Sequence, residues 1–421
     1  MTEARGESVG LVREVASGRE RMLAAITRDP IGVTSWDLGY GLSSFTRIAH
    51  ERICDYLCVD PGKQYYWSRM LQTVYPGKET EAAVCGDIRM VTIRAPIAVI
   101  AERSSQIVQE EEYTDAWGIT RKLSSDRLYY DIARSPLADC RTAKECVDAF
   151  TSPRVPTEQL SHLVDRVKDY RARGFAVGAT CLAGIFEMLF WLRGYKKGFL
   201  DFARAPAIVE TVMDSLLEVQ VAFWCAILEM IGEWLDIAVL TEDLGTQTSL
   251  VISPSQFRLL VKPRLEHLIN AIKRRSPHTR VMLHSCGAVF PLIGDFIDIG
   301  VDILNPIQPA ASGMEAERLK REFGSELCFH GGVDVQRVLC HGTPDQVIEH
   351  VEHCVEVLGA GGGYIAAPSH CIQPDVPPEN IVAMVECLKE KAYSTRREEV
   401  DVSTGGTDGL GLPTESPQGE Q

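Results

Sequence analysis

Short apolar runs alternate with amphipathic stretches along the chain from about residue 175 onward. Each run has five or six residues, a length typical of strands buried in a parallel sheet. Two of the stretches between the runs have helix-start signals. Ser253–Gln256 and Thr343–Gln346 each have the pattern of a capping box, with proline at the first helical position. The apolar runs are Phe175–Thr180, Ile237–Thr241, Arg280–His284, Val301–Pro306, Leu327–Gly331 and Gly363–Ala367.

Repeated strand–helix units predict a parallel sheet with helices packed outside it. The six units, together with extended segments at Ile31–Trp36 and Ile97–Ala101, supply enough strands for a (β/α)8 TIM barrel. An open doubly wound sheet is the alternative. The glycine cluster at 359–363 carries no phosphate-binding motif and is interpreted as a helix stop followed by a tight turn.

Two segments interrupt this alternation. Residues 111–138 are rich in Tyr, Trp, Thr and Ile around Trp117–Thr120, which predicts an antiparallel hairpin inserted before the regular barrel units. Residues 394–421 are polar and glycine-rich, which predicts a disordered tail. We therefore expect one barrel domain over residues 1–393, followed by the tail.

The amino-acid composition argues against several classes of protein. The 421 residues are 45% hydrophobic, enough for two average domains or one large barrel. A net charge of −15 argues against nucleic-acid binding, which needs basic surfaces. Met1–Gly10 lacks the features of a secretory signal, and 13 cysteines, an odd number, suggest reduced thiols in the cytoplasm. The best apolar run, Val221–Leu228, is far shorter than the roughly 20 residues of a membrane helix, so we expect no membrane span.

The polar residues that follow the predicted strands supply the candidate chemistry, because active sites of parallel barrels lie at the carboxyl ends of the strands. His284 and Cys286 end the run that starts at Arg280, and Cys371 follows the run that ends at Ala367. Imidazole and thiolate are ligands that zinc prefers, and a catalytic zinc keeps one position open. A packed histidine and a buried free cysteine are the alternative for the first two residues. His370 competes with Cys371 for the third position.

Other strand-end residues complete the candidate site. Glu242 is a weaker candidate for a fourth ligand, and the alternative is a carboxylate bonded to a neighbouring helix N-terminus. Asp334 either orients a ligand histidine or caps the helix that follows it. We assign Glu242, Asp334 and Tyr364 to catalysis, and Asn305, Gln308 and His330 to cofactor binding.

These motifs resemble those of the uroporphyrinogen decarboxylase superfamily, which includes cobamide-dependent methyltransferases. The resemblance covers about residues 20–391. It rests on the motifs Tyr113–Gly118, Glu242–Gln247, His284–Gly287, Leu304–Pro309, His330–Asp334 and Pro368–Asp375.

Two features distinguish the branches of this superfamily. The decarboxylases have an arginine-rich N-terminal motif that grips the carboxylates of their tetrapyrrole, whereas Ser35–Phe45 has no arginine and the first one to follow is Arg47. The methyltransferases bind zinc through a His-x-Cys pair and a distant cysteine. His284, Cys286 and Cys371 match that pattern one by one, which favours the methyltransferase branch.

The resemblance thus implies a Zn²⁺-dependent enzyme that moves a methyl group between a corrinoid and a small molecule. The corrinoid, a methylcobamide, would arrive on a partner protein, and the small molecule would be a thiol, a pterin or a methylated compound. A homodimer is compatible with the sequence. One alternative is a metal-free decarboxylase-like lyase that uses Asp37, Arg47 or Tyr364. Another is a non-enzymatic protein that binds a corrinoid or a thiol.

Overall fold

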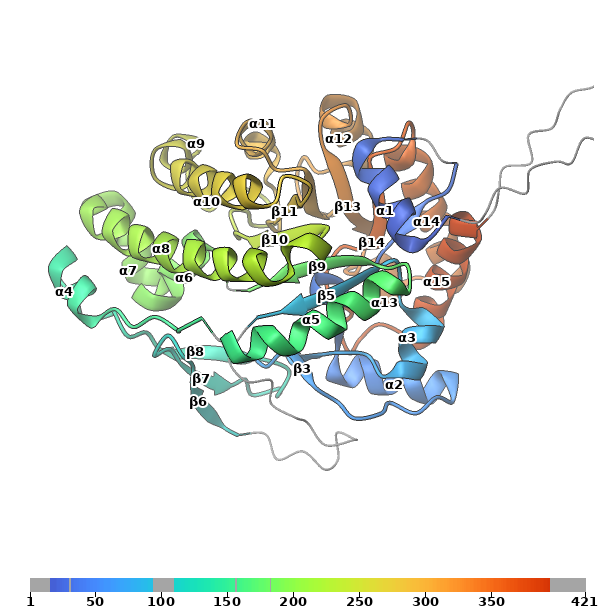
Figure 1. Ribbon diagram of the computed structural model, residues 1–421, viewed down its shortest axis with the longest axis horizontal. Coiled ribbons are helices and arrows are strands. Elements are labelled where there is room, and N and C mark those ends of the chain that lie inside the picture. The colour runs from blue at the N-terminus through green and yellow to red at the C-terminus, as the bar shows by residue number, and fades with distance from the viewer. Residues whose placement is uncertain (1–15, 30–31, 94–109, 156, 182, 394–421) are drawn as a thin grey trace, which may run out of the picture.

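Eight parallel strands form the central sheet of the computed structural model, which describes residues 16–29, 32–93, 110–155, 157–181 and 183–393. Their order in the sheet is β1-β14-β13-β12-β11-β10-β9-β5. The two end strands also meet, because Asp87 N–H donates to the Trp36 carbonyl at 2.8 Å. Strand order therefore follows chain order around a ring, and the predicted (β/α)8 barrel is confirmed (Figure 1). The strands are β1 Ser35–Trp36, β5 Ile88–Thr92, β9 Ala176–Thr180, β10 Ile237–Thr241, β11 Arg280–His284, β12 Ile303–Ile307, β13 Cys328–Val333 and β14 Tyr364–Pro368.

Helices surround the barrel and follow its strands in turn (Figure 1). The capping boxes predicted at Ser253 and Thr343 both form, and they start α9 and α14. The helices are α1 Gly18–Thr27, α2 Arg47–Leu57, α3 Lys78–Val84, α4 Ala143–Ala149, α5 Thr157–Ala172, α6 Ile185–Arg193, α7 Tyr195–Arg204, α8 Pro206–Ile231, α9 Pro254–Gln256, α10 Lys262–Arg275, α11 Ile293–Asp298, α12 Ala316–Phe323, α13 Val338–His341, α14 Pro344–Gly359 and α15 Pro378–Tyr393.

Helix α8 is long and apolar enough to cross a membrane, judged by length and composition alone. In this fold it packs against α4, α5, α6 and α10 instead. Its buried apolar residues belong to the same hydrophobic cluster as those of these helices and of the sheet, as is typical of a core helix.

One predicted strand was misplaced. The second barrel strand is β5 at Ile88–Thr92, whereas the expected segment at 97–101 lies outside the described residues. The charged Arg89 interrupts the apolar run of β5, so the hydrophobic pattern alone does not identify this strand. Its guanidinium is nevertheless buried, donates to the Gly86 and Ile88 carbonyls, and stacks on Phe175 at 3.7 Å.

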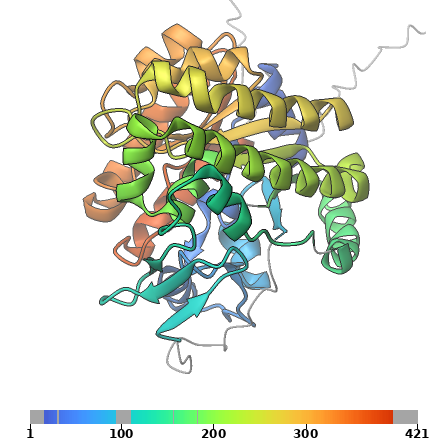
Figure 2. The same cartoon turned by 90° about the vertical axis from the view of Figure 1, so that its left-hand side faces the viewer.

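Two small antiparallel sheets accompany the barrel. The segment expected to form a hairpin at 111–138 holds the three strands β6 Glu112–Thr114, β7 Thr120–Leu123 and β8 Tyr130–Arg134. This sheet lies to one side of the barrel (Figures 1 and 2). The other sheet joins β2 Phe45–Thr46, β4 Thr73–Val74 and β3 Tyr66–Ser68. The tail predicted at 394–421 lies outside the described residues.

Alternate residues of the strands face two separate apolar layers. The inner layer fills the barrel and includes Met90, Val239, Met282, Ile303 and Ile365. The outer layer packs between the sheet and the helices. Each strand residue is therefore assigned to the barrel interior or to the helix side by its register alone.

Carboxylates tie the strands together at their amino ends. Asp87, Asp236 and Asp302 each precede a strand, and each accepts the backbone N–H of a residue in the strand before it. All three also pair with arginine or lysine side chains. This end of the barrel is thus stabilised by buried charge-assisted hydrogen bonds, a kind stronger than neutral ones.

Replacing Asp236 tests this stabilisation. Asp236→Asn weakens the pairs with Arg19 and Arg171 and the bond from Val177 N–H, so the free energy of unfolding should fall by about 2 kcal/mol. Urea denaturation measures the change. The exposed Asp148→Asn, which loses only a surface pair with Lys144, should change it by less than about 0.5 kcal/mol. Equal effects of the two substitutions would contradict the role of Asp236.

Candidate metal centre

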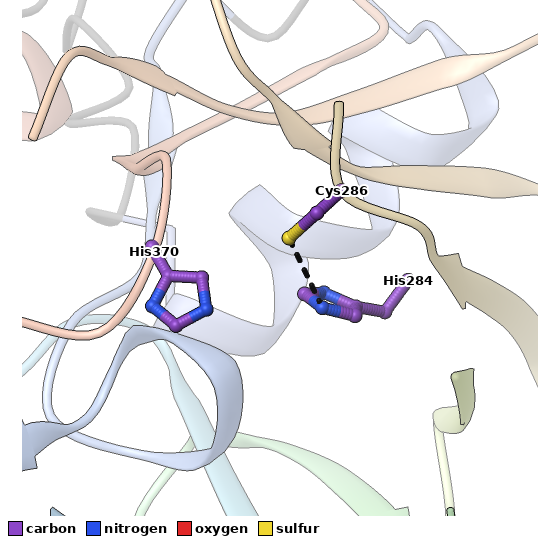
Figure 3. Close-up of side chains that lie close together, drawn as sticks. All are labelled: His284, Cys286 and His370. Carbon is purple, nitrogen blue, oxygen red and sulfur yellow. Dashed lines mark hydrogen bonds between the residues drawn. The ribbon is translucent and has the colours of Figure 1, made fainter. Parts of the chain in front are cut away.

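Three side chains that can bind a metal meet at the carboxyl ends of β11 and β14. The ligand atoms of His284, Cys286 and His370 all lie within 4.8 Å of one another. His284 is the last residue of β11, Cys286 lies in the loop after it, and His370 comes from the loop after β14 (Figure 3). Zinc bonds of about 2.0–2.3 Å in tetrahedral geometry place ligand atoms roughly 3.5 Å apart. His284 Nε2 and Cys286 Sγ are already 3.5 Å apart, so the residues fit a zinc ion.

The third member of this cluster is His370 and differs from Cys371, the residue assigned as third ligand from the sequence. Among the described residues, the group within metal-binding reach contains His370 in its place. Cys371 Sγ instead lies 3.0 Å from His370 Nδ1 and accepts a hydrogen bond from Gln373 Nε2 at 3.1 Å. Residues 369 and 370 form a bend after β14, and the side chains of His370 and Cys371 contact each other, so Cys371 remains next to the cluster.

Two of the residues assigned to cofactor binding lie behind His284. Its Nδ1 is 2.6 Å from Asn305 Oδ1, and Asn305 Nδ2 is 2.7 Å from His330 Nδ1. His330 Nε2 in turn lies 3.1 Å from Asp37 Oδ2. Asn305, His330 and Asp37 are at most 2% exposed, so this line of polar groups runs from the metal-binding cluster into the barrel interior.

The third residue assigned to cofactor binding holds the loop that carries Cys286. Gln308 Oε1 accepts the backbone N–H of Gly287 at 2.7 Å. Gly287 has a φ of +86°, and a Cβ there would collide with the Thr246 carbonyl oxygen. Glycine and Gln308 together therefore set the path of the chain directly after Cys286.

Glu242, one of the residues assigned to catalysis, uses its carboxyl oxygens to accept backbone N–H groups. Glu242 is buried and accepts the N–H groups of Ile185 and Phe186 at 2.7 and 2.8 Å, where α6 begins. Burial raises its pKa to about 8, against the opposing effect of these hydrogen bonds. The hydrogen bonds of Glu242 therefore match the alternative interpretation, in which its carboxyl group bonds to a neighbouring helix N-terminus.

Asp334 and Tyr364 also have structural roles. Asp334 Oδ1 accepts the N–H groups of Gln336 and Arg337, so it caps the turn after β13. Tyr364 belongs to the outer apolar layer, and its hydroxyl donates to the Gly331 carbonyl at 2.8 Å. Its register on β14 directs the ring toward the helices, which corrects its assignment to the site.

Two carboxylates near the cluster were not assigned roles from the sequence. Asp243 Oδ1 accepts the Cys286 N–H at 3.2 Å and lies 3.8 Å from His284 Nε2. Glu187 sits in the first turn of α6 and accepts a hydrogen bond from the Thr241 hydroxyl at 3.3 Å. Burial and the charge of Asp243 raise the pKa of Glu187 to about 7. A lone carboxylate among the apolar residues of α6 was the signal that could have found it.

His284 and Cys286 shift each other's titration strongly. Burial lowers the pKa of His284, but the Cys286 thiolate outweighs this and raises it to about 9. Burial raises the pKa of Cys286, but the charged imidazole of His284 outweighs this and lowers it to about 7. Without metal, the imidazolium–thiolate pair is therefore about half formed near pH 7, and a metal that binds must displace the imidazole proton.

Comparison with known proteins assigns the chain to a family. The sequence model of the family described as Uroporphyrinogen decarboxylase (URO-D) matches residues 174–391, just over half of the chain. The chain belongs to the uroporphyrinogen decarboxylase family. All three residues of the metal-binding cluster lie within the matched part, whereas Asp37 lies before it.

Individual members of this family match a shorter segment. A uroporphyrinogen decarboxylase of Chlorobium phaeobacteroides is 25% identical over 146 residues, which cover 34% of this chain and 39% of that protein. One of Wolinella succinogenes is 25% identical over 131 residues, 30% of this chain and 35% of that protein. The matched segment thus spans well under half the length of these relatives.

Among solved structures, a methyltransferase from Methanosarcina mazei has a similar fold. It superposes with a TM-score of 0.60 over 89% of this chain and 99% of that one, at 18% sequence identity. At that identity the likeness concerns the fold, and it extends over nearly the whole of the described barrel.

The reactivity of Cys286 tests the geometry of the pair. In metal-free protein, alkylation of Cys286 by iodoacetamide should show a midpoint near pH 7, because the thiolate is the reactive form. His284→Gln removes the positive partner and should move the midpoint upward. Peptide mapping across pH measures both, with the exposed Cys58 as an internal reference. An unchanged midpoint in His284→Gln would show that the two residues do not form the pair.

Proposed function

We propose that this chain is a zinc-dependent methyltransferase that moves a methyl group between a corrinoid on a partner protein and a small molecule. The small molecule would be a thiol, a pterin or a methylated compound. The observation that carries the proposal is the convergence of His284, Cys286 and His370 at the carboxyl ends of β11 and β14. This is the end of a parallel barrel at which enzymes of this fold carry their chemistry.

Each residue of the centre has a distinct part in the proposed reaction. His284, Cys286 and His370 would hold the zinc ion, which when bound lowers the pKa of a thiol or water in its open position. Asp243 accepts the Cys286 N–H and so orients the loop of that ligand. Glu187, whose pKa is about 7, is suited to take the proton that the acceptor releases at neutral pH.

The proposed transfer balances without a further reagent. The electron pair of the acceptor sulfur would form the new bond to the methyl carbon, and the corrinoid, as the leaving group, would keep the electron pair of its bond to the methyl group. The proton of the acceptor thiol passes to the Glu187 carboxylate. We place this reaction in the cytoplasm, because no disulfide joins any of the 13 cysteines, all of which lie in the described residues.

Metal binding tests the ligand set. Protein purified without chelator should hold about one zinc per chain. Cys286→Ala and His370→Ala should each weaken zinc binding by more than about 100-fold, whereas Cys371→Ser, which removes only a partner of His370, should weaken it by about 10-fold. Metal analysis and competition with a chromophoric chelator measure these changes.

Two outcomes would contradict the ligand set. A wild-type protein that folds and binds no zinc would remove the metal and with it the proposed reaction. Zinc loss in Cys371→Ser together with retention in His370→Ala would return the third position to the cysteine.

Turnover separates the proposal from its alternatives. With methylcobalamin and a panel of small thiols, the zinc-loaded protein should produce methylated thiol and demethylated cobalamin, and Cys286→Ala should not. Absorption spectra of the corrinoid and mass analysis of the thiol measure the reaction. Binding of methylcobalamin without turnover on any acceptor would favour the non-enzymatic binder.

A uroporphyrinogen decarboxylase-like lyase is the second candidate, because the curated relatives carry that name. It would release carbon dioxide from a tetrapyrrole without metal. Asp37, a residue available to such a lyase, is paired with His330 in the barrel interior. Carbon dioxide release from uroporphyrinogen by metal-free protein would replace the methyltransferase proposal.

A further inference from the structure

The line of polar groups behind His284 has a single consistent direction of donation. Asn305 Oδ1 can only accept, so His284 Nδ1 donates to it at 2.6 Å. The other end of the same amide, Nδ2, can only donate, so His330 Nδ1 accepts from it at 2.7 Å and carries no proton. The proton of the neutral His330 ring is then on Nε2, which donates to Asp37 Oδ2 at 3.1 Å.

The carboxylate at the far end selects this direction. If the Asn305 amide turned over, His330 Nδ1 would have to donate, and its bare Nε2 would face the acceptor oxygen of Asp37. His284 Nδ1 would then have to accept, which moves the ring proton to Nε2, the atom that lies 3.5 Å from Cys286 Sγ. A protonated Nε2 cannot bind a metal.

The surroundings of Asp37 leave it a second, unused oxygen. Asp37 Oδ1 is buried and has no hydrogen-bond partner among the described residues. Asp37 and His330 line an internal cavity of about 10 Å³, otherwise bounded mainly by apolar side chains such as Leu42 and Met282. This volume is about that needed for one water molecule, which would complete the hydrogen bonds of the carboxylate.

We propose that Asp37, acting through His330 and Asn305, keeps a proton on His284 Nδ1, so that Nε2 is the nitrogen that gives up its proton and binds the metal. The three are positioning residues in this proposal, because they act on the metal site through the hydrogen bond to His284. The inference rests on the proposed metal centre and explains why three buried polar residues extend from it into an apolar barrel. Outer-shell partners of this kind typically change metal affinity by 10–100-fold.

The zinc affinity of four variants tests whether this line of hydrogen bonds supports metal binding. Asp37→Leu keeps the branched shape of the side chain and removes the acceptor, so the Kd for zinc should rise by about 10–100-fold. Asn305→Leu should have a similar effect. Asn305→Asp should stay within about threefold of the wild type, because its carboxylate still accepts from His284 Nδ1. Met282→Leu, a volume-conserving change in the same cavity, is the matched control and should leave the Kd unchanged.

A double variant distinguishes a positioning role of Asp37 from a general effect on the stability of the protein. In the Asn305→Asp background, Asp37→Leu should leave the Kd unchanged, because the line no longer passes through position 305. Urea unfolding of each metal-free variant shows whether it is folded. Losses that multiply in the double variant, or an unchanged Kd in Asp37→Leu, would overturn the inference.

A readout that needs no metal accompanies the titrations. In metal-free protein, nitrogen-15 NMR should show His330 protonated at Nε2 and bare at Nδ1, with the signals assigned through His330→Gln. A proton on Nδ1 would overturn the inference even if zinc binds tightly. Failure of wild-type protein to bind zinc, with His330 in the expected tautomer, would instead remove the proposed function, and the positioning role would fall with it.

Discussion

Closure of the parallel sheet at the short strand β1 is the constraint on which the rest of the site depends. β1 has only two residues, and Trp36 pairs with Ala366 of β14 while its carbonyl accepts from Asp87 N–H. The Asp87 carboxylate also accepts from Trp36 N–H and the Ser35 hydroxyl. Strands β1 and β14 are thereby joined, and Asp37 reaches His330 of β13, the next strand beyond β14.

The two ends of the barrel use charge in different ways. At the amino ends of the strands, the buried Asp87 and Asp236 and the half-buried Asp302 bind backbone N–H groups and cationic side chains. At the carboxyl ends, the half-buried Glu187 makes no ion pair with a lysine or arginine among the described residues, and its pKa is raised to about 7. The carboxylates that stabilise the fold are paired with cationic groups, whereas the carboxylate near the metal-binding cluster keeps a pKa near neutral pH and can exchange protons.

Much of this arrangement was readable from the sequence. The strand that ends at His284 was predicted with its observed bounds, and the barrel rule then placed His284 and Cys286 at the mouth. The capping boxes at Ser253 and Thr343 were also readable, because a cap depends on residues within one turn. Strand β5 was missed because Arg89 breaks its apolar run, and its burial depends on Phe175, which lies far along the chain.

The roles of single polar residues could not be read in the same way. Glu242 and Asp334 follow strands just as His284 does, but their oxygens are taken by backbone N–H groups of neighbouring turns. Tyr364 faces the helices because strand register, with a period of two, assigns alternate residues to opposite sides. The choice between His370 and Cys371 likewise depends on which of two adjacent side chains the loop directs toward the cluster.

The sequence by itself determined the fold class, the family and the strand end at which metal-binding residues gather, because periodicity, caps and motifs are local properties of the chain. Only the tertiary structure decided that His370 joins His284 and Cys286, and that Asp37 stands behind His284 through His330 and Asn305. The physical reason is that hydrogen-bond partners are chosen by distance and direction in space. Residues 37 and 330 become partners only when the barrel closes.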